Sequence, residues 1–214
     1  MPPKQPSIKG RGTTDKIDGR FNTYQRELIE DGWFQEPENP PKTTVEIEHP
    51  KTIITRNQSP DLPFSQSINA YRGCEHGCIY CFARPSHAYL GLSPGLDFET
   101  RLTVKPNAAS LLKQELAAKN YQCSPISLGA NTDPYQPIER EYQITRQILQ
   151  VFNETHHPCH IVTKSSMVER DIDILQQMAR HNLVQVHLSV TTLDSALSRV
   201  LEPRASAPKR RLKT

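Results

Sequence analysis

From residue 64 onward, apolar and polar positions follow regular local patterns. Four short stretches are rich in β-branched and other apolar residues and are bounded by turn-forming or polar residues, as strands are. They are SINAY (67–71), SPISLGA (124–130), CHIVTK (159–164) and VQVHLSVTT (184–192). We expect each of them to form a strand.

Four other stretches place their apolar residues on one helical face. They are NAASLLKQELAAKN (107–120), EREYQITRQILQVFNE (139–154), VERDIDILQQMARHN (168–182) and DSALSRVLE (194–202). In the second, Ile144, Ile148 and Phe152 recur every four residues. Alternation of strands and helices favours a parallel sheet of βα units. We therefore predict an α/β fold, a partial (βα) TIM-like barrel with about four βα units.

The stretch after the last predicted helix, EPRASAPKRRLKT, shows no further strand and no capping element. Four βα units make only half of an eight-fold barrel. We therefore expect residues 63–214 to be an incomplete core domain, either truncated at its C-terminus or with its sheet closed in another way.

Residues 1–62 differ in composition, being rich in proline and polar residues. We predict an N-terminal extension that is either extended chain laid over the core domain or disordered. The stretch FNTYQRELIEDGWF (21–34) has the character of a short helix. Scattered basic residues fit a solvated tail better than a phosphate-binding segment; they are Lys4, Lys9, Arg11, Lys16 and Arg20.

Composition narrows the class of protein. Hydrophobic residues make up 36% of the 214 residues, the mean hydropathy is −0.62 and the formal net charge is +3. This mildly basic balance permits a nucleic-acid partner without requiring one. No apolar run has the length of a membrane span, and the polar start MPPKQPSIKGRGTTDK is unlike a signal peptide. We expect no membrane association and a cytoplasmic location, where clustered cysteines bind metal or react more often than they form disulfides.

Three of the five cysteines, Cys74, Cys78 and Cys81, form the pattern C-x3-C-x2-C directly after the first predicted strand. Gly73 and Gly77 permit the positive φ values of a loop wrapped around a compact centre. An iron–sulfur cubane held by three cysteines keeps one iron open, and an open iron can bind a small chelating molecule. The spacing therefore favours a [4Fe–4S] cluster with a working coordination site.

Zinc is the alternative reading of the same cysteines. His76 or His87 would then complete the ligand set, or Cys123 or Cys159 would come in from elsewhere. Cys123 and Cys159 lie at or beside predicted strand starts, where a small buried residue is the simpler interpretation.

Four sequence blocks, in order, resemble one family of enzymes. The blocks are NAYRGCEHGCIYCFAR (69–84), with Tyr80 before the last cysteine, GANTDPYQPIERE (129–141), HIVTKS (160–165) and SVTTLDSALSRVLEPRASAPKRRL (189–212). Together they are similar to the radical S-adenosylmethionine (SAM) superfamily, in its spore photoproduct lyase-like or DNA repair photolyase-related branch. The resemblance covers residues 64–214, and the N-terminal extension fits an uncharacterised sister group of that branch.

The resemblance implies a [4Fe–4S] cluster on the three cysteines, with SAM chelating the open iron. One-electron reduction by a flavodoxin- or ferredoxin-type partner would yield a 5′-deoxyadenosyl radical that abstracts hydrogen from a substrate. The resemblance to a branch related to DNA repair makes nucleic acid the leading candidate for the substrate. The hydrogen-donating cysteine of the lyases belongs to a later region, so lesion repair is not implied. The competing hypotheses are a non-catalytic zinc or iron–sulfur module and an inactive fragment.

The resemblance also implies contacts to SAM from residues at the predicted strand ends. They are Tyr80, Thr132, Asp133, Lys164, Ser165, Ser189, Thr191 and Arg204. Thr132 and Asp133 would meet the methionine ammonium; the alternative is a turn in which Asp133 caps its own backbone. Lys164 and Ser165 would meet the carboxylate or a ribose hydroxyl, or Lys164 would be an ordinary solvated residue.

For the remaining positions two roles stay open. Ser189 and Thr191 share one face of the last strand and would bind the ribose, or would be satisfied core hydroxyls. Arg204 would pair bidentately with a carboxylate, or simply with Glu202. Tyr80 would stack near adenine or merely pack.

Overall fold

The computed structural model describes residues 8–22 and 41–214. Its strands are β1 (Thr44–Ile47), β2 (Thr55–Arg56), β3 (Gln66–Ile68), β4 (Tyr71–Arg72), β5 (Arg101–Val104), β6 (Ile126–Leu128), β7 (Cys159–Thr163) and β8 (Val184–Leu188). Its α-helices are α1 (Asp97–Thr100), α2 (Ala108–Leu116), α3 (Glu139–Tyr142), α4 (Ile144–Glu154), α5 (Ile172–Arg180), α6 (Ser195–Leu201) and α7 (Pro208–Lys213). Two 3₁₀ helices, η1 (Arg84–Leu90) and η2 (Ser166–Asp171), complete the order.

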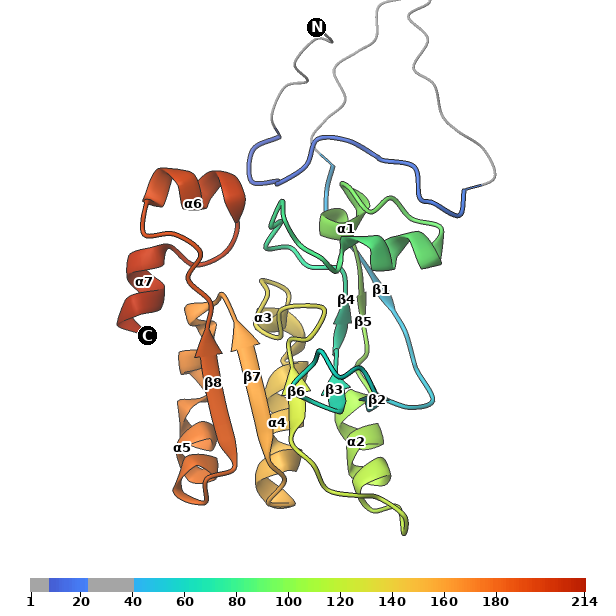
Figure 1. The fold of residues 1–214 in the computed structure, drawn as a ribbon, viewed down its shortest axis with the longest axis vertical. Coiled ribbons are helices and arrows are strands. Elements are labelled where there is room, and N and C mark those ends of the chain that lie inside the picture. Colours follow the sequence, from blue (N-terminus) through green and yellow to red (C-terminus); the bar gives the residue numbers. More distant parts are fainter. Residues whose placement is uncertain (1–7, 23–40) are drawn as a thin grey trace, which may run out of the picture.

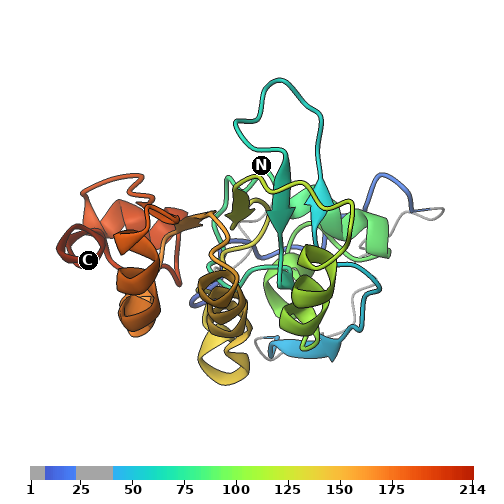
Figure 2. The ribbon, with the colours of Figure 1, turned by 90° about the horizontal axis from the view of Figure 1, so that it is seen from below.

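A five-stranded sheet in the order β2-β3-β6-β7-β8 forms the core of the molecule. The strands β3, β6, β7 and β8 run parallel, and β2 is antiparallel at one edge. The helices α2, α4 and α5 lie side by side along one face of the sheet (Figures 1 and 2). The predicted alternation of four strands with four helices is therefore confirmed, and the fold is α/β.

Apolar stripes on the helices hold this layer to the sheet. Ile144, Ile148 and Phe152 of α4 are each at most 1% exposed, and they belong to the same core cluster as Ile126 and Ile161 of the sheet. Each such side chain stabilises the fold by about 1.5–3 kcal/mol when fully buried. The pattern that predicted these helices is the one that packs them.

A second, three-stranded sheet in the order β1-β5-β4 carries the chain toward the cysteine loop. The predicted strand 67–71 is in fact two strands, because β3 belongs to the first sheet and β4 to the second. The break falls at Asn69: its side-chain oxygen accepts from the Asn131 amide (3.0 Å), and its carbonyl accepts from Lys105 Nζ (3.0 Å). These bonds lie outside both ladders and turn the chain toward β5.

The far edge of the main sheet is open in the described part of the chain. β8 has β7 on one side and no described strand on the other (Figure 1). The strands therefore form an open sheet there, and the TIM-like barrel stays a prediction.

The C-terminal stretch differs from expectation, since residues 208–213 form α7 with Pro208 in its first turn. Proline suits this position because its missing N–H would have no helical partner there. No further strand forms in EPRASAPKRRLKT, but helix α7 was not among the predicted elements, because it is held by an ion pair, described below, that gives no apolar periodicity.

The described part of the N-terminal extension is extended chain laid over the core, one of the two possibilities that the sequence left open. Within it, β1 pairs with β5, and β2 pairs with β3 across the predicted boundary after residue 62. The helix predicted at 21–34 lies outside the described residues apart from its first two. In the described ranges, no helix combines the length and apolar character needed to cross a membrane.

Candidate metal-cluster site

The three cysteines lie on a loop between β4 and η1 that requires glycine at two positions. Gly73 and Gly77 have φ values of 75° and 67°, as the sequence predicted. A Cβ on Gly73 would lie 2.8 Å from the Phe98 carbonyl oxygen, and one on Gly77 would lie 2.7 Å from Glu99 Oε2. Both conformation and space therefore exclude a side chain from these turns.

Hydrogen bonds from neighbouring elements fix the first half of this loop. The amide of Cys74 donates to the Phe98 carbonyl (2.9 Å). The fully buried Gln136 accepts from the Glu75 amide (3.0 Å) and donates to the Gly73 carbonyl (3.1 Å). Sequence reasoning missed Gln136, although it lies in one of the blocks that carry the family resemblance.

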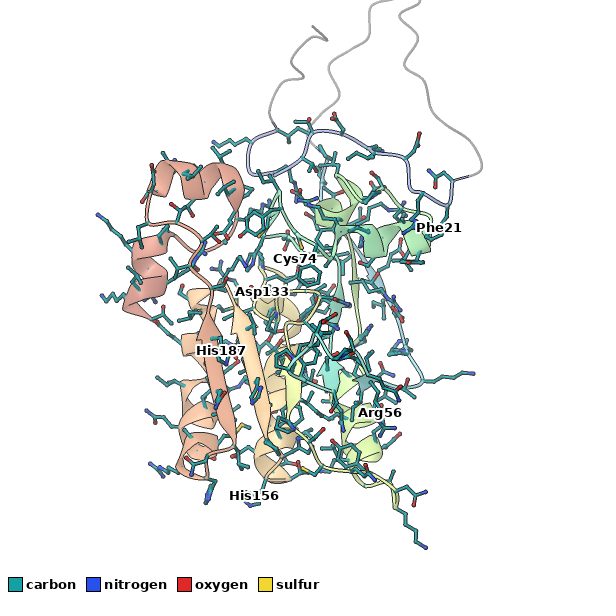
Figure 3. The ribbon with its side chains drawn as sticks, in the orientation of Figure 1. Phe21, Arg56, Cys74, Asp133, His156 and His187 are labelled. Atoms are coloured by element: carbon teal, nitrogen blue, oxygen red, sulfur yellow. The ribbon has the colours of Figure 1, made fainter. Side chains whose placement is uncertain are left out.

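The cysteine loop opens onto a cavity of about 100 Å³ at the carboxyl ends of the strands. Cys74, Cys78 and Cys81 all line it, together with residues that follow β6 and with the end of β7, Val162 to Lys164. Figure 3 shows Cys74 and Asp133 close together at this edge. Three thiols from one loop thus share one cavity with the polar ends of two neighbouring strands.

Burial favours the protonated form of two of these thiols, Cys74 and Cys78, when no metal is bound. It raises the pKa of Cys74 well above its ordinary value, and the nearby Asp133 carboxylate adds to the effect. Burial also raises the pKa of Cys78 to about 11, although the Lys164 ammonium opposes the rise. Because thiolates are the ligands, a metal centre at this site must displace these protons as it binds.

The donor set fits an iron–sulfur cluster better than a single zinc ion. Within the described ranges, no three His, Cys, Asp or Glu side chains converge closely enough to hold one metal ion. A cubane is less demanding, because each cysteine binds its own iron and the sulfurs stand further apart. Of the two candidate histidines, His76 lines the cavity, with its Nδ1 3.2 Å from an Asp133 oxygen, whereas His87 does not line it and its Nε2 lies 3.0 Å from the Arg101 carbonyl.

The two other cysteines lie at the opposite end of the sheet. Cys159 begins β7 and is 1% exposed in the apolar core, as a small buried residue would be. Cys123 is exposed in the loop before β6, so its predicted burial was wrong. Since both lie at the amino ends of strands whose carboxyl ends meet the cysteine loop, neither reaches the cavity.

Asp133 lines the cavity, but protein donors already surround its carboxylate. It accepts from Thr163 Oγ1 (2.6 Å), the Lys164 amide (2.7 Å) and the Tyr135 amide (2.9 Å). Burial alone would raise the pKa of Asp133, yet His76 and these donors hold it below its ordinary value. The Tyr135 bond is the backbone cap that the sequence offered as the alternative. Asp133 therefore ties the loop after β6 to the end of β7.

Of the seven other residues expected to meet SAM, four line one of two neighbouring cavities. Thr132 and Lys164 line the cysteine cavity, and Lys164 Nζ donates to Ser189 Oγ (3.3 Å) while lying 5.9 Å from the centre of the Tyr80 ring. Ser165 and Arg204 instead line a neighbouring cavity of about 460 Å³. His76 lines both cavities and separates them.

Glu202 accepts hydrogen bonds from two of the residues expected to bind SAM, Tyr80 and Thr191. Tyr80 donates its hydroxyl to Glu202, and Thr191 donates to the same carboxylate oxygen (2.6 Å). The second oxygen accepts from Arg211, a fully buried side chain of α7. Although burial opposes it, these donors hold the pKa of Glu202 below its ordinary value. Arg204 does not pair with Glu202, as one reading of the sequence had it; it pairs with Glu75 (2.6 Å).

Residues 8–22, the N-terminal strap, cover the outer side of the cysteine loop. Beneath the strap, Arg84 donates to the Cys78 carbonyl (2.9 Å) and to the fully buried Glu99 carboxylate (2.6 Å). The strap completes this pair, because the Gly12 amide (2.9 Å) and the Thr13 hydroxyl (3.2 Å) donate to Glu99. The solvated tail expected here is thus part of the structure around the cysteines.

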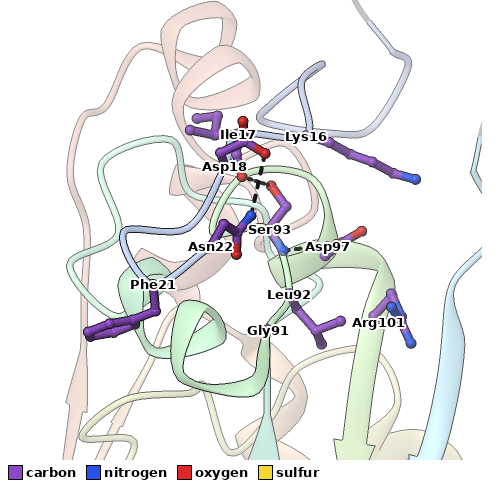
Figure 4. A pocket seen from close by; sticks show the side chains of 10 residues that line it. All are labelled: Lys16, Ile17, Asp18, Phe21, Asn22, Gly91, Leu92, Ser93, Asp97 and Arg101. Atoms are coloured by element: carbon purple, nitrogen blue, oxygen red, sulfur yellow. Dashed lines mark hydrogen bonds between the residues drawn. The ribbon is translucent and has the colours of Figure 1, made fainter. Parts of the chain in front are cut away.

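A cavity of about 510 Å³ lies where the strap meets the loop 91–97 (Figure 4). Ser93 Oγ donates to the Ile17 carbonyl (2.8 Å) beside it. Lys16 and Asp97 are among the residues that line it, so its charge is mixed. We interpret this cavity as a gap left where the strap packs against residues 91–97, and not as a binding site.

Gly12→Ala is expected to lift the strap, because a Cβ there would lie 1.8 Å from the Gly77 carbonyl oxygen. Overpacking of this kind costs on the order of 1–3 kcal/mol. Hydrogen exchange followed by mass spectrometry should show several-fold faster exchange in residues 8–22. Lys9→Ala, at an exposed strap position, is the matched control. Unchanged exchange in Gly12→Ala would contradict this packing.

Comparison with known proteins assigns the family. The model of the radical SAM superfamily matches residues 68–214. Uncharacterised proteins of Mycobacterium tuberculosis and Mycobacterium bovis are 39% identical over 151 residues, which cover 71% of this chain and 44% of theirs. An uncharacterised protein of Methanocaldococcus jannaschii is 28% identical over 145 residues, covering 68% of this chain and 51% of its own.

The chain thus spans about half the length of the curated relatives it matches. No solved structure matches it. The family match contains all three cysteines and every residue of the cavity they line. This chain belongs to the radical SAM superfamily, whose members bind a [4Fe–4S] cluster and S-adenosylmethionine.

Proposed function

We propose that this chain carries the cofactor-binding part of a radical SAM enzyme, with the cluster on Cys74, Cys78 and Cys81. The observation that carries the proposal is the shared cavity: three thiols from one loop face the carboxyl ends of two parallel strands. When bound, the cluster and SAM supply a 5′-deoxyadenosyl radical for hydrogen abstraction. The chain's own residues position the cofactors and limit access of water.

The cavity at the cysteines is large enough for only part of this group. Its volume of about 100 Å³ equals that of about three water molecules at about 30 Å³ each. We propose that the cluster and the methionine end of SAM lie there. The nucleoside would extend along the sheet edge, past Lys164, Ser189 and Thr191. Tyr80, held by Glu202, would border the same path.

Three of the expected contacts take different roles in this proposal. Asp133 orients the end of β7, so that Lys164 faces the cavity, and meets the methionine ammonium only through its remaining acceptor capacity. Ser165 accepts from the Met167 amide and so caps η2. Arg204 is engaged by Glu75 and supports the cysteine loop. We propose that Ser165 and Arg204 act on the site through its shape.

The finer assignment rests on the sequence blocks quoted above. We propose membership of the spore photoproduct lyase-like branch, a core domain that begins near residue 63 and a flavodoxin- or ferredoxin-type reductant. Nucleic acid is the proposed substrate class, supported by the kinship of the blocks.

Electron paramagnetic resonance of the anaerobically reconstituted, dithionite-reduced chain tests this function. We expect a reduced-cluster signal that shifts when SAM is added, because the open iron gains a chelating ligand. Release of 5′-deoxyadenosine, measured by chromatography, would separate an active protein from one that only binds. Bound zinc with no cluster signal would overturn the proposal in favour of a structural metal site.

A further inference from the structure

A cavity of about 180 Å³, here called the Lys105 site, lies next to the cysteine cavity. Asn131 and Thr132 line both cavities and form the wall between them. Its other sides come from the β3–β4 junction, from Lys105 after β5 and from η1. A group bound here would therefore lie one residue's width from the proposed cofactor site.

Among the described residues, two cations, Lys105 and Arg72, line the Lys105 site and no carboxylate does. The Lys105 ammonium donates to the Asn69 carbonyl (3.0 Å), and no described carboxylate forms an ion pair with it. Arg72 binds Glu48 through Nε (2.6 Å) and Nη2 (2.9 Å), which leaves Nη1 without a hydrogen-bond acceptor among the described residues. Lys105 and Arg72 carry two positive charges and Glu48 carries one negative charge, so the three side chains together have a net charge of +1.

Lys105 is a half-buried cation that forms no ion pair with a described carboxylate, and burying a cation without a close partner is costly. Burial lowers the pKa of Lys105, and the neighbouring Arg72 adds to this effect while Glu48 opposes it. A bound anion would remove both penalties at once. Perturbed cations in a cavity beside a reaction site are candidates for ligand binding.

Neutral donors complete the lining. Because the Asn69 side-chain oxygen accepts from the Asn131 amide, its NH₂ group is the end left for a ligand. The Ser86 hydroxyl and the Asn131 side chain also line the site. His87, 1% exposed, lines it as well, and its Nδ1 has no partner in the described structure.

We propose that the Lys105 site binds a phosphate group of the substrate, on Lys105, Arg72 and the Asn69 amide. Two cations and several N–H or O–H donors match the oxygens of a phosphate. The volume equals that of about six water molecules at about 30 Å³ each, which suits one phosphate group. As a substrate site this inference rests on the proposed function, since it places the reacting carbon across the Asn131–Thr132 wall.

Calorimetric titration of inorganic phosphate into the reconstituted chain tests the site. Lys105→Gln is expected to weaken phosphate binding at least tenfold. Lys113→Gln is the matched control, because Lys113 is exposed on α2 and pairs with Glu154 at the surface (3.2 Å). It should leave phosphate binding unchanged. Equal binding by both variants, or no binding by the unaltered chain, would overturn the site.

If Lys105→Gln lowers the melting temperature, its weaker phosphate binding could reflect partial unfolding. Arg72→Gln then serves as a second variant of the same site. Arg72 is exposed on β4, so its loss spares the core, and it should also weaken phosphate binding. Glycerol 3-phosphate and a short single-stranded DNA are then tested as competitors. Displacement by the first assigns a phosphate monoester, and displacement by the second assigns a nucleic-acid backbone. Phosphate binding that neither competitor affects would overturn the assignment to substrate.

The same samples keep this inference separate from the proposed function. A cluster signal that shifts with SAM, without phosphate binding, defeats the Lys105 site alone. Phosphate binding that depends on Lys105, without any response to SAM, defeats the proposed function and leaves an anion site.

Discussion

Cys78→Ala is expected to leave the reconstituted protein without its [4Fe–4S] cluster. In the proposed site three cysteines of the described cavity each bind one iron, and two cannot hold a cubane that already has one open iron. Iron and sulfide analysis should show near-complete loss, and the reduced-cluster resonance should disappear. Full iron content with an unchanged spectrum in Cys78→Ala would end the assignment.

Cys123→Ala is the control for this experiment. It removes an exposed thiol at the amino ends of the strands, so cluster content should stay the same. Loss of the cluster in Cys123→Ala would show that a fourth cysteine reaches the centre. Comparison of the two variants thus separates specific ligation from general loss of thiols.

Arg211→Met is expected to destabilise the protein strongly. The Arg211 side chain is 0% exposed and its Glu202 partner 1%, so the substitution leaves a buried carboxylate without its counter-ion. Breaking such a pair costs about 3–5 kcal/mol. Arg211 also donates to the Ser206 carbonyl (2.6 Å) and the Ser189 carbonyl (2.8 Å), and these bonds are lost too. Denaturant unfolding of the two proteins measures the difference.

The adjacent arginine supplies a matched control. Arg210 also pairs with a glutamate, Glu169, but both side chains are well exposed, at 43% and 38%. Surface pairs of this kind contribute little, so Arg210→Met should unfold at nearly the same denaturant concentration as the unaltered chain. Equal losses in Arg210→Met and Arg211→Met would mean that burial does not decide the effect.

Loss of Arg211 should also reach the cofactor site. Glu202 holds Tyr80, which lies between Cys78 and Cys81, and Arg211 holds Glu202. We therefore expect the SAM-induced shift of the cluster resonance to need a higher SAM concentration in Arg211→Met. A variant that is less stable but responds to SAM unchanged would show that α7 has a purely structural role.

Sequence reasoning found the features that depend on residues close together in the chain. The spacing of Cys74, Cys78 and Cys81 selects a three-ligand centre, and Gly73 and Gly77 permit the turns between them. The same holds for the βα units, because a helical stripe or an alternating strand is a property of five to fifteen consecutive residues. The motif blocks also placed Thr132 and Lys164 at the cavity.

Other features depended on contacts between distant parts of the chain. Asp133 could be named as polar and well placed, but only the fold shows that Thr163 and Lys164 already occupy its oxygens. Likewise, the sequence around Gly12 is typical of a solvated tail, and only the fold shows that its amide donates to Glu99, 87 residues away in the sequence. No pattern of neighbouring residues in the sequence predicts either contact.

The sequence by itself therefore identified the family and the alternating βα units of the main sheet, and it predicted the three cysteine ligands. Only the tertiary structure decided that Arg211 is buried against Glu202, that the strap closes over the cysteine loop, and that Lys105 forms no ion pair with a carboxylate of the described residues. The physical reason is common to all three. A charge or a glycine has the same local propensity whether it faces solvent or a buried partner, and its energy is set by what the fold brings beside it.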